Sequence, residues 1–243
     1  EHTLAGQCRY CGQTTNTGQY DWLVTDIELR SREPRGPMLT GTVEEQGTDL
    51  PTVVDADAVP RMKALEAKDP AFQWQAFQLR VDLIFREFQA GWTGRDLTRM
   101  RPFMSDNLFQ AQVYWIETYK RQGLRNVTER ARITGIELSR ATADRFFDAV
   151  TVRVRATGLD YTVSDEGKLV GGSKSKERAY TEYWTLIRGS ARTGPTHTKP
   201  ECPNCGAPLS INMAGHCAYC SVKVSSGEFD WVLSRIEQDE VYR

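Results

Sequence analysis

The cysteines of this chain all stand in Cys-x-x-Cys pairs, which can bind a metal ion. The pairs are Cys8 with Cys11, Cys202 with Cys205, and Cys217 with Cys220. Each pair can place two thiolates on one tight turn, and two such turns close a tetrahedral site of four sulfurs. Four protein ligands leave no open coordination position, so we expect the last two pairs to hold a structural zinc ion. Iron is the main alternative, because four thiolates alone do not exclude it.

The cysteine pair near the start of the chain belongs to a repeat. Cys8 corresponds to Cys217 and Trp22 to Trp231, an offset of 209 residues in both cases. Only the second copy has an upstream pair. We therefore predict a complete zinc ribbon over residues 200–243 and the latter half of a second ribbon over residues 1–30. The chain is then expected to begin inside a module.

Three interpretations of Cys8 and Cys11 remain open. Their partners lie upstream, or they bind metal with a second copy of the protein, or they are free thiols. The repeat favours the first interpretation. We expect Trp22 and Trp231 each to close the small core behind its own metal site, with stacking on a ligand as the alternative. His216 adjoins a cysteine, but four thiolates already suffice, so we expect this histidine to be solvated.

Composition excludes some classes of protein. The chain has 243 residues and a formal net charge of −1, which argues against a polyanion-binding surface over its whole length. No apolar run approaches the roughly 18–20 residues of a membrane span. Paired thiols at this spacing indicate a reducing compartment, with a secreted disulfide scaffold as the alternative. We expect a cytoplasmic protein that is membrane-associated, if at all, through segments outside this chain.

Helices are expected in the first half of the segment between the cysteine pairs. Residues 31–68 are rich in Pro and Gly and predict a linker. Asp69 can cap a helix and Pro70 fits its first position. Apolar residues from Trp74 to Trp92 then recur at spacings of three and four, which predicts an amphipathic helix ending at Gly91–Gly94. Shorter helices are predicted over residues 95–103 and from Ser105 or Asp106 to 122.

Strands are expected in the second half. Alternation of apolar and polar residues predicts strands over 127–139, 147–157 and 177–188, with 160–170 extending the second around a turn. We predict a loop at Gly171 to Ser173 and a second linker over residues 193–199. Helices followed by antiparallel strands predict an α+β domain over residues 69–192, with the helices packed on one face of a curved sheet.

Several segments of this domain occur in a familiar order. Phe77-x-x-x-Val81-x-x-Ile84-Phe85-x-x-Phe88-Gln89-x-x-Trp92 is followed by the run from Asp96 to Ser105, by Asp148 to Val154, and by Tyr183 to Arg188. This arrangement resembles the Tim44-like domain over roughly half of the chain. The resemblance implies a nuclear-transport-factor-two-like cone, in which helices pack into the concave face of a twisted sheet around a pocket. It also implies a membrane-associated tethering role.

The residues of this domain offer little for catalysis. The three histidines are His2, His197 and His216, all outside the predicted domain, so no histidine can act there as a general base. Glu117, Asp148 and Glu182 are carboxylates that nothing in the sequence pairs, and we expect each to be a solvated or salt-bridged surface residue. Eight arginines gather in the middle of the chain, at positions 121, 125, 130, 132, 140, 145, 153 and 155. They could contact anionic lipid or RNA, but interleaved acids favour an ordinary mixed surface.

These observations favour a non-enzymatic adaptor or tethering protein. Its expected partners are proteins or an anionic membrane surface, bound through the cone domain and the zinc ribbons. A ligand-binding or enzymatic domain that uses the pocket is the first alternative. A nucleic-acid-binding zinc-ribbon protein is the second, disfavoured by the near-zero net charge.

Overall fold

The computed structural model describes residue 28, residues 39–40 and residues 48–243. The chain divides into two units, Glu1–Met38 and Leu39–Arg243. The helices and strands reported below all lie in the second unit. Among the described residues, no helix combines the length and the apolar character that crossing a membrane requires.

The α-helices lie in the first half of the second unit. They are α1 (Ala58–Lys68), α2 (Trp74–Gly94), α3 (Leu97–Met100) and α4 (Asp106–Arg121), with the 3-10 turn η1 (Arg101–Phe103) between the last two. A second 3-10 turn, η2 (Val224–Ser226), lies in the cysteine-containing segment. Ser105 caps α4, as predicted, by accepting a hydrogen bond from the Leu108 N–H. The prediction of a linker up to residue 68 is wrong at α1, which buries Met62 and Leu65. Asp69 ends α1 and does not begin α2.

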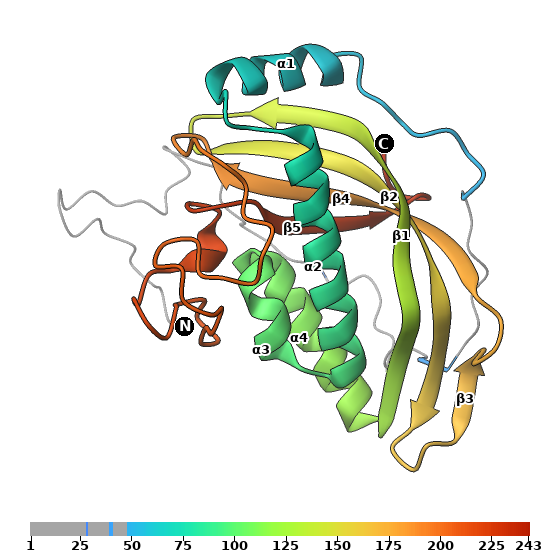
Figure 1. The fold of residues 1–243 in the computed structure, drawn as a ribbon. Helices are drawn as coiled ribbons and strands as arrows, with labels where there is room; N and C mark the ends of the chain where they lie inside the picture. Colours follow the sequence, from blue (N-terminus) through green and yellow to red (C-terminus); the bar gives the residue numbers. More distant parts are fainter. Residues whose placement is uncertain (1–27, 29–38, 41–47) are drawn as a thin grey trace. The chain divides into compact units, whose positions relative to one another are not determined.

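The sheet is antiparallel and contains five strands. These are β1 (Leu124–Ala143), β2 (Phe147–Ser164), β3 (Leu169–Gly172), β4 (Arg178–Gly189) and β5 (Val232–Gln238). The strand order is β1-β2-β4-β5, and β3 pairs with β2. The predicted loop at Gly171 is therefore the end of a short strand. Figure 1 shows α2 and α4 against one face of the curved sheet, with α1 beside β1, so the α+β prediction is confirmed.

The last strand comes from the segment that the sequence assigned to the ribbon. Strand β5 pairs with β4 from Glu182–Gln238 to Ile187–Val232. The N–H of Ser105 donates to the Leu233 carbonyl at 2.9 Å, which joins the strand to the start of α4. The cysteine-containing segment is thus inserted between β4 and β5 of one sheet. The predicted boundary, with a separate module over residues 200–243, is wrong for residues 232–238.

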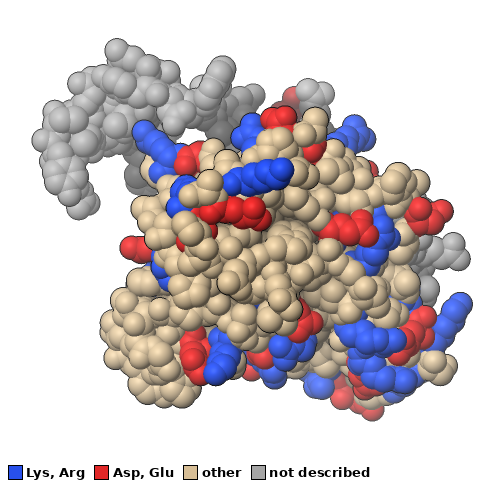
Figure 2. All heavy atoms as spheres, turned by 45° about the horizontal axis from the view of Figure 1, so that its top comes forward, with Lys and Arg blue, Asp and Glu red and all other residues tan. Residues whose placement is uncertain are grey.

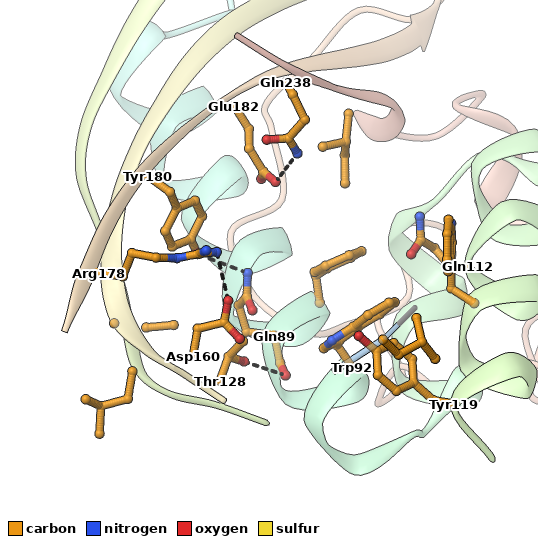
Figure 3. Close-up of a pocket in the computed structure, with 17 residues that line it drawn as sticks. Gln89, Trp92, Gln112, Tyr119, Thr128, Asp160, Arg178, Tyr180, Glu182 and Gln238 are labelled. Atoms are coloured by element: carbon orange, nitrogen blue, oxygen red, sulfur yellow. Dashed lines mark hydrogen bonds and ion pairs between the residues drawn. The ribbon is translucent and has the colours of Figure 1, made fainter. Parts of the chain in front are cut away.

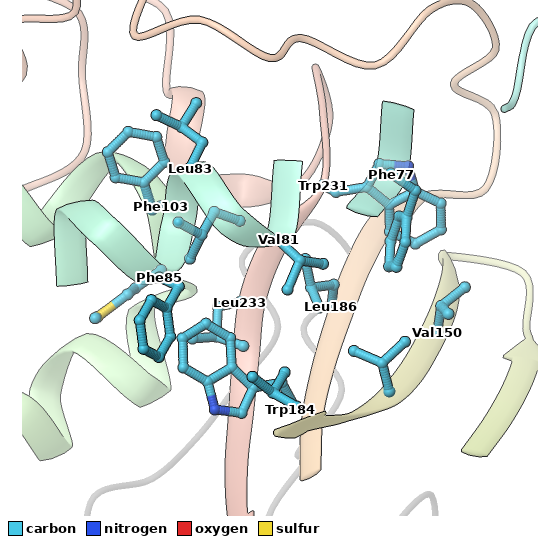
Figure 4. Close-up of a cluster of buried hydrophobic side chains, with 14 of the residues drawn as sticks. Phe77, Val81, Leu83, Phe85, Phe103, Val150, Trp184, Leu186, Trp231 and Leu233 are labelled. Carbon is cyan, nitrogen blue, oxygen red and sulfur yellow. The ribbon is translucent and has the colours of Figure 1, made fainter. Parts of the chain in front are cut away.

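Trp231 lies in the core between helices and sheet. Its side chain is 0% exposed and meets Phe77 edge to face at 5.2 Å between ring centroids. Phe72 contacts the same indole at 6.1 Å. Figure 4 shows Trp231 beside Phe77, with Trp184 and Leu186 of β4 in the same cluster. The prediction that Trp231 closes a core behind the metal site is therefore wrong, because α2 and β4 supply a larger apolar surface.

Buried ion pairs hold both ends of the insertion. Arg80 of α2 donates to the Trp231 carbonyl at 3.0 Å and lies 3.8 Å from Asp230. Arg188 at the end of β4 donates to Asp69 at 2.9 Å, and both side chains are 1% exposed. Burial alone would raise the pKa of Asp69, but the Gly194 N–H and Arg188 outweigh it and lower the pKa. These pairs satisfy charges that would otherwise be costly to bury.

Candidate metal centre and pocket

The four cysteines of the inserted segment form one cluster. The Sγ atoms of Cys202, Cys205, Cys217 and Cys220 all lie within 4.8 Å of one another. The Cys202–Cys220 pair is separated by 3.8 Å and the Cys205–Cys217 pair by 4.0 Å. Four sulfurs bound tetrahedrally at about 2.3 Å from a zinc ion lie about 3.8 Å apart. The cluster can therefore hold a metal ion, and its dimensions fit zinc.

Backbone and side-chain donors around the cluster point at sulfur. The Tyr219 N–H donates to Cys217 Sγ at 3.4 Å, and the Asn204 amide donates to Cys220 Sγ at 3.5 Å. The N–H of Val222 and the Asn204 amide lower the pKa of the Cys220 thiol to about 6. Burial raises the pKa of the Cys202 thiol to about 12, so this thiolate in particular needs the charge of a bound cation.

The metal segment is fixed to the helices by its own polar contacts. Arg101 of η1 donates from Nε to the Met213 carbonyl at 2.8 Å and forms an ion pair with Asp106. Lys223 donates to the other oxygen of Asp106 at 2.6 Å. Gly215 packs at this junction with φ +89°, where an added Cβ would lie 2.9 Å from the Arg101 guanidinium. Glycine is therefore required there for both conformation and close approach.

Of the other candidate ligands, His216 alone lies in the part of the chain that the structure describes. Cys8 and Cys11 lie outside the described residues, as does Trp22. The four-cysteine cluster does not include His216, whose N–H donates to the Asn212 side chain at 3.0 Å.

A pocket of about 410 Å³ opens between the helices and the sheet. Strands β4 and β5 line one wall with Arg178, Tyr180, Glu182, Ile236 and Gln238. The strand residues follow the two-residue alternation that places side chains on one face. The opposite wall comes from α2 and α4, through Phe88, Gln89, Trp92, Gln112, Trp115 and Tyr119. Figure 3 shows Glu182 and Gln238 across the space from Trp92 and Tyr119.

Two carboxyl groups are among the described lining residues, and each accepts hydrogen bonds. Asp160 accepts from Arg178 at 2.8 Å and from the Asn126 amide at 2.8 Å. Glu182 accepts from Trp184 Nε1 at 2.9 Å and from the Gln238 amide at 3.0 Å. Burial raises the pKa of Glu182, although these two donors and the more distant Arg178 oppose the shift. None of the described residues that line the pocket is a histidine, lysine, serine or cysteine.

Residues 60–198, which make up more than half of the chain, match the family model of the Tim44-like domain. The chain belongs to the Tim44-like family. The matched region contains most of α1, the helices α2 to α4 and the strands β1 to β4, and it stops just before the cysteine cluster. No curated protein matches the chain. In this Tim44-like protein, the fifth strand of the described sheet therefore follows the metal segment and lies beyond the matched region.

The carboxylates that the sequence left without partners differ in position. Glu117 lies on the outer side of α4 and pairs with Lys120 at 2.9 Å, as expected of a surface residue. Asp148 is 2% exposed and pairs with Lys68 at 2.6 Å, and Glu182 lines the pocket, so the surface predictions for both are wrong. The sequence signal that could have placed Glu182 in the pocket is its two-residue spacing from Tyr180 and Arg178, which puts all three side chains on one face of β4.

Half of the arginines in the middle of the Tim44-like domain are compensated by acidic partners in the described part of the chain. Among the described residues, four of the eight form ion pairs: Arg132 with Glu177, Arg140 with Asp55, Arg153 with Asp239 and Arg155 with Glu137. Figure 2 shows basic and acidic side chains interspersed on the visible face. These pairs lower the local positive charge that an anionic surface would need.

Proposed function

We propose that this Tim44-like protein is a non-enzymatic adaptor whose cone domain and inserted zinc ribbon form one binding unit. The observation that carries the proposal is the arrangement of the pocket carboxyl groups. Asp160 is held by Arg178 and Asn126, and Glu182 is held by Trp184 and Gln238. Hydrogen bonds that fix both carboxyls suit the recognition of a ligand, and no serine, cysteine, lysine or histidine stands beside them among the described lining residues to form a nucleophile–base pair.

The ribbon is the second part of the proposed unit. Met213 and Tyr219 are 48% and 64% exposed on its surface, while Cys202 and Cys217 are buried. Exposed apolar residues on a rigid, metal-held scaffold are suited to contact a protein partner. In this proposal the partners are proteins, with an anionic membrane surface as an additional contact, in a reducing compartment such as the cytoplasm.

A turnover experiment tests the non-enzymatic part of the proposal. The metal-loaded protein is screened against small metabolites by thermal shift, and each compound that binds is incubated with the protein and analysed by mass spectrometry. We expect binding without chemical change, since the described lining residues include no serine, cysteine, lysine or histidine. A product formed by the wild-type protein and lost in Glu182→Gln would contradict the proposal.

A small-ligand-binding function is a second candidate, favoured by the open pocket. A volume of about 410 Å³ lies within the range of about 300–1,000 Å³ that is typical of small-molecule sites. The two candidates are compatible, because an adaptor can be controlled by a bound ligand.

A further inference from the structure

The pocket combines aromatic rings with a carboxyl group that forms no ion pair with the residues that the structure describes. Five of its lining residues are aromatic: Phe88, Trp92, Trp115, Tyr119 and Tyr180. Phe88 and Trp92 stack at 6.1 Å between ring centroids, and Tyr119 meets Trp92 edge to face at 5.7 Å. Such rings offer apolar contact and a negative π-face to a ligand.

The charges of the pocket do not balance. Asp160 and Arg178 neutralise each other at 2.8 Å. Glu182 receives only the neutral donors Trp184 and Gln238, and it has no ion pair among the residues that the structure describes. One negative charge therefore remains uncompensated when Glu182 is ionised.

Burial makes this uncompensated charge costly. It raises the pKa of Glu182, against the hydrogen bonds that lower it. A cation beside the carboxylate would offset the cost of burial, as opposite charges do in other buried sites. An anionic ligand would be repelled by the Glu182 carboxylate, and the one arginine among the described lining residues is already engaged by Asp160.

We infer that this pocket binds an organic cation, with an ammonium group facing Glu182 and an apolar body against Trp92 and Tyr119. The inference rests on the small-ligand-binding function proposed above and names the class of ligand. Quaternary ammonium groups combine a diffuse positive charge with an apolar surface, which suits a pocket that has a carboxylate on one wall and aromatic rings on the opposite wall. Such a group can belong to a free metabolite or to a phosphatidylcholine headgroup.

The test compares charged and neutral probes on the intact, metal-loaded protein. Calorimetric titrations use benzyltrimethylammonium, choline, and the analogue of choline in which carbon replaces nitrogen. We expect saturable binding of the cations and at least about tenfold weaker binding of the carbon analogue. Glu182→Gln should weaken cation binding about tenfold, whereas Glu240→Gln, the same change at an exposed position, should not.

The variant is expected to fold, because the Gln238 amide can rotate to accept a hydrogen bond from the new glutamine. An unchanged unfolding temperature would verify this. Equal affinity for choline and its carbon analogue, or cation binding that is unaffected in Glu182→Gln, would overturn the ligand class. In that case, saturable binding of the neutral analogue would still support the proposed small-ligand-binding function. No saturable binding of any of the probes would overturn the ligand class too.

Vesicles distinguish the two sources of the cation. Flotation with phosphatidylcholine vesicles that is lost in Glu182→Gln would assign the site to a lipid headgroup. Binding of free choline without flotation would assign it to a soluble cation. Flotation that is equal in the wild-type and variant proteins, with no binding of free cations, would contradict the inference.

Discussion

Removal of the metal ion should destabilise the whole unit from Leu39 to Arg243, and not only the ribbon. The cysteine cluster is inserted between β4 and β5. Strand β5, at the edge of the described sheet, therefore depends on the inserted segment for its position. We expect chelation or Cys217→Ser to lower the unfolding temperature by about 10 °C or more. A structural zinc ion contributes several kcal/mol to the free energy of unfolding. Each kcal/mol shifts the unfolding temperature by about 2–4 °C in a domain of this size.

Circular dichroism in the near ultraviolet can follow this transition, because Trp184 and Trp231 are both fully buried in the core. Cys217→Ser leaves Cys8 and Cys11 in place and so isolates the C-terminal site. Ser210→Ala, an exposed change in the same segment, is the matched control and should leave the transition unchanged. The protein could instead unfold in two separate transitions, with the larger one unaffected by metal removal. That result would show that the ribbon is an independent module.

Trp231→Ala should be among the most destabilising single substitutions in this protein. The indole is 0% exposed, packs against Phe72 and Phe77, and lies 4.8 Å from the Arg188 guanidinium. Truncation of a buried tryptophan costs about 3–5 kcal/mol, which corresponds to about 10 °C here. Urea denaturation measures the change in the free energy of unfolding.

The metal content separates two explanations of the Trp231→Ala result. Because the indole lies in the core of the Tim44-like domain, we expect the folded variant to retain its metal ion. Tyr219→Ala, which removes a 64% exposed ring from the ribbon, should change stability by less than about 0.5 kcal/mol. A Trp231→Ala protein that loses its metal but keeps the stability of the sheet would place the tryptophan behind the metal site instead.

Local patterns predicted much of this fold because they carry their own physical causes. The apolar stripe of α2, the Ser105 cap of α4 and the alternation along β2 and β4 each depend on neighbours within a few residues. The cysteine spacing likewise predicted the four-sulfur cluster. Helix α1 was missed because Pro60 suggested a linker, although proline is well tolerated in the first turn of a helix.

Long-range partners could not be predicted in the same way. The repeat suggested that Trp231 serves the metal site, whereas its contacts come from α2 and β4, far away in the sequence. Nothing local to Arg80 and Arg188 predicts their burial, because their partners Asp230 and Asp69 are distant in the chain. Glu182 became a candidate site residue only when β5 brought Gln238 beside it.

Amide hydrogen exchange of Val232–Gln238 is the most direct test of the central claim that ribbon and domain form one binding unit. In the metal-loaded protein, β5 should be protected as strongly as β4, with which it pairs. After chelation, or in Cys217→Ser, we predict loss of protection in β5 and faster exchange in β4. Protection of β5 that is unchanged by metal removal would contradict the account.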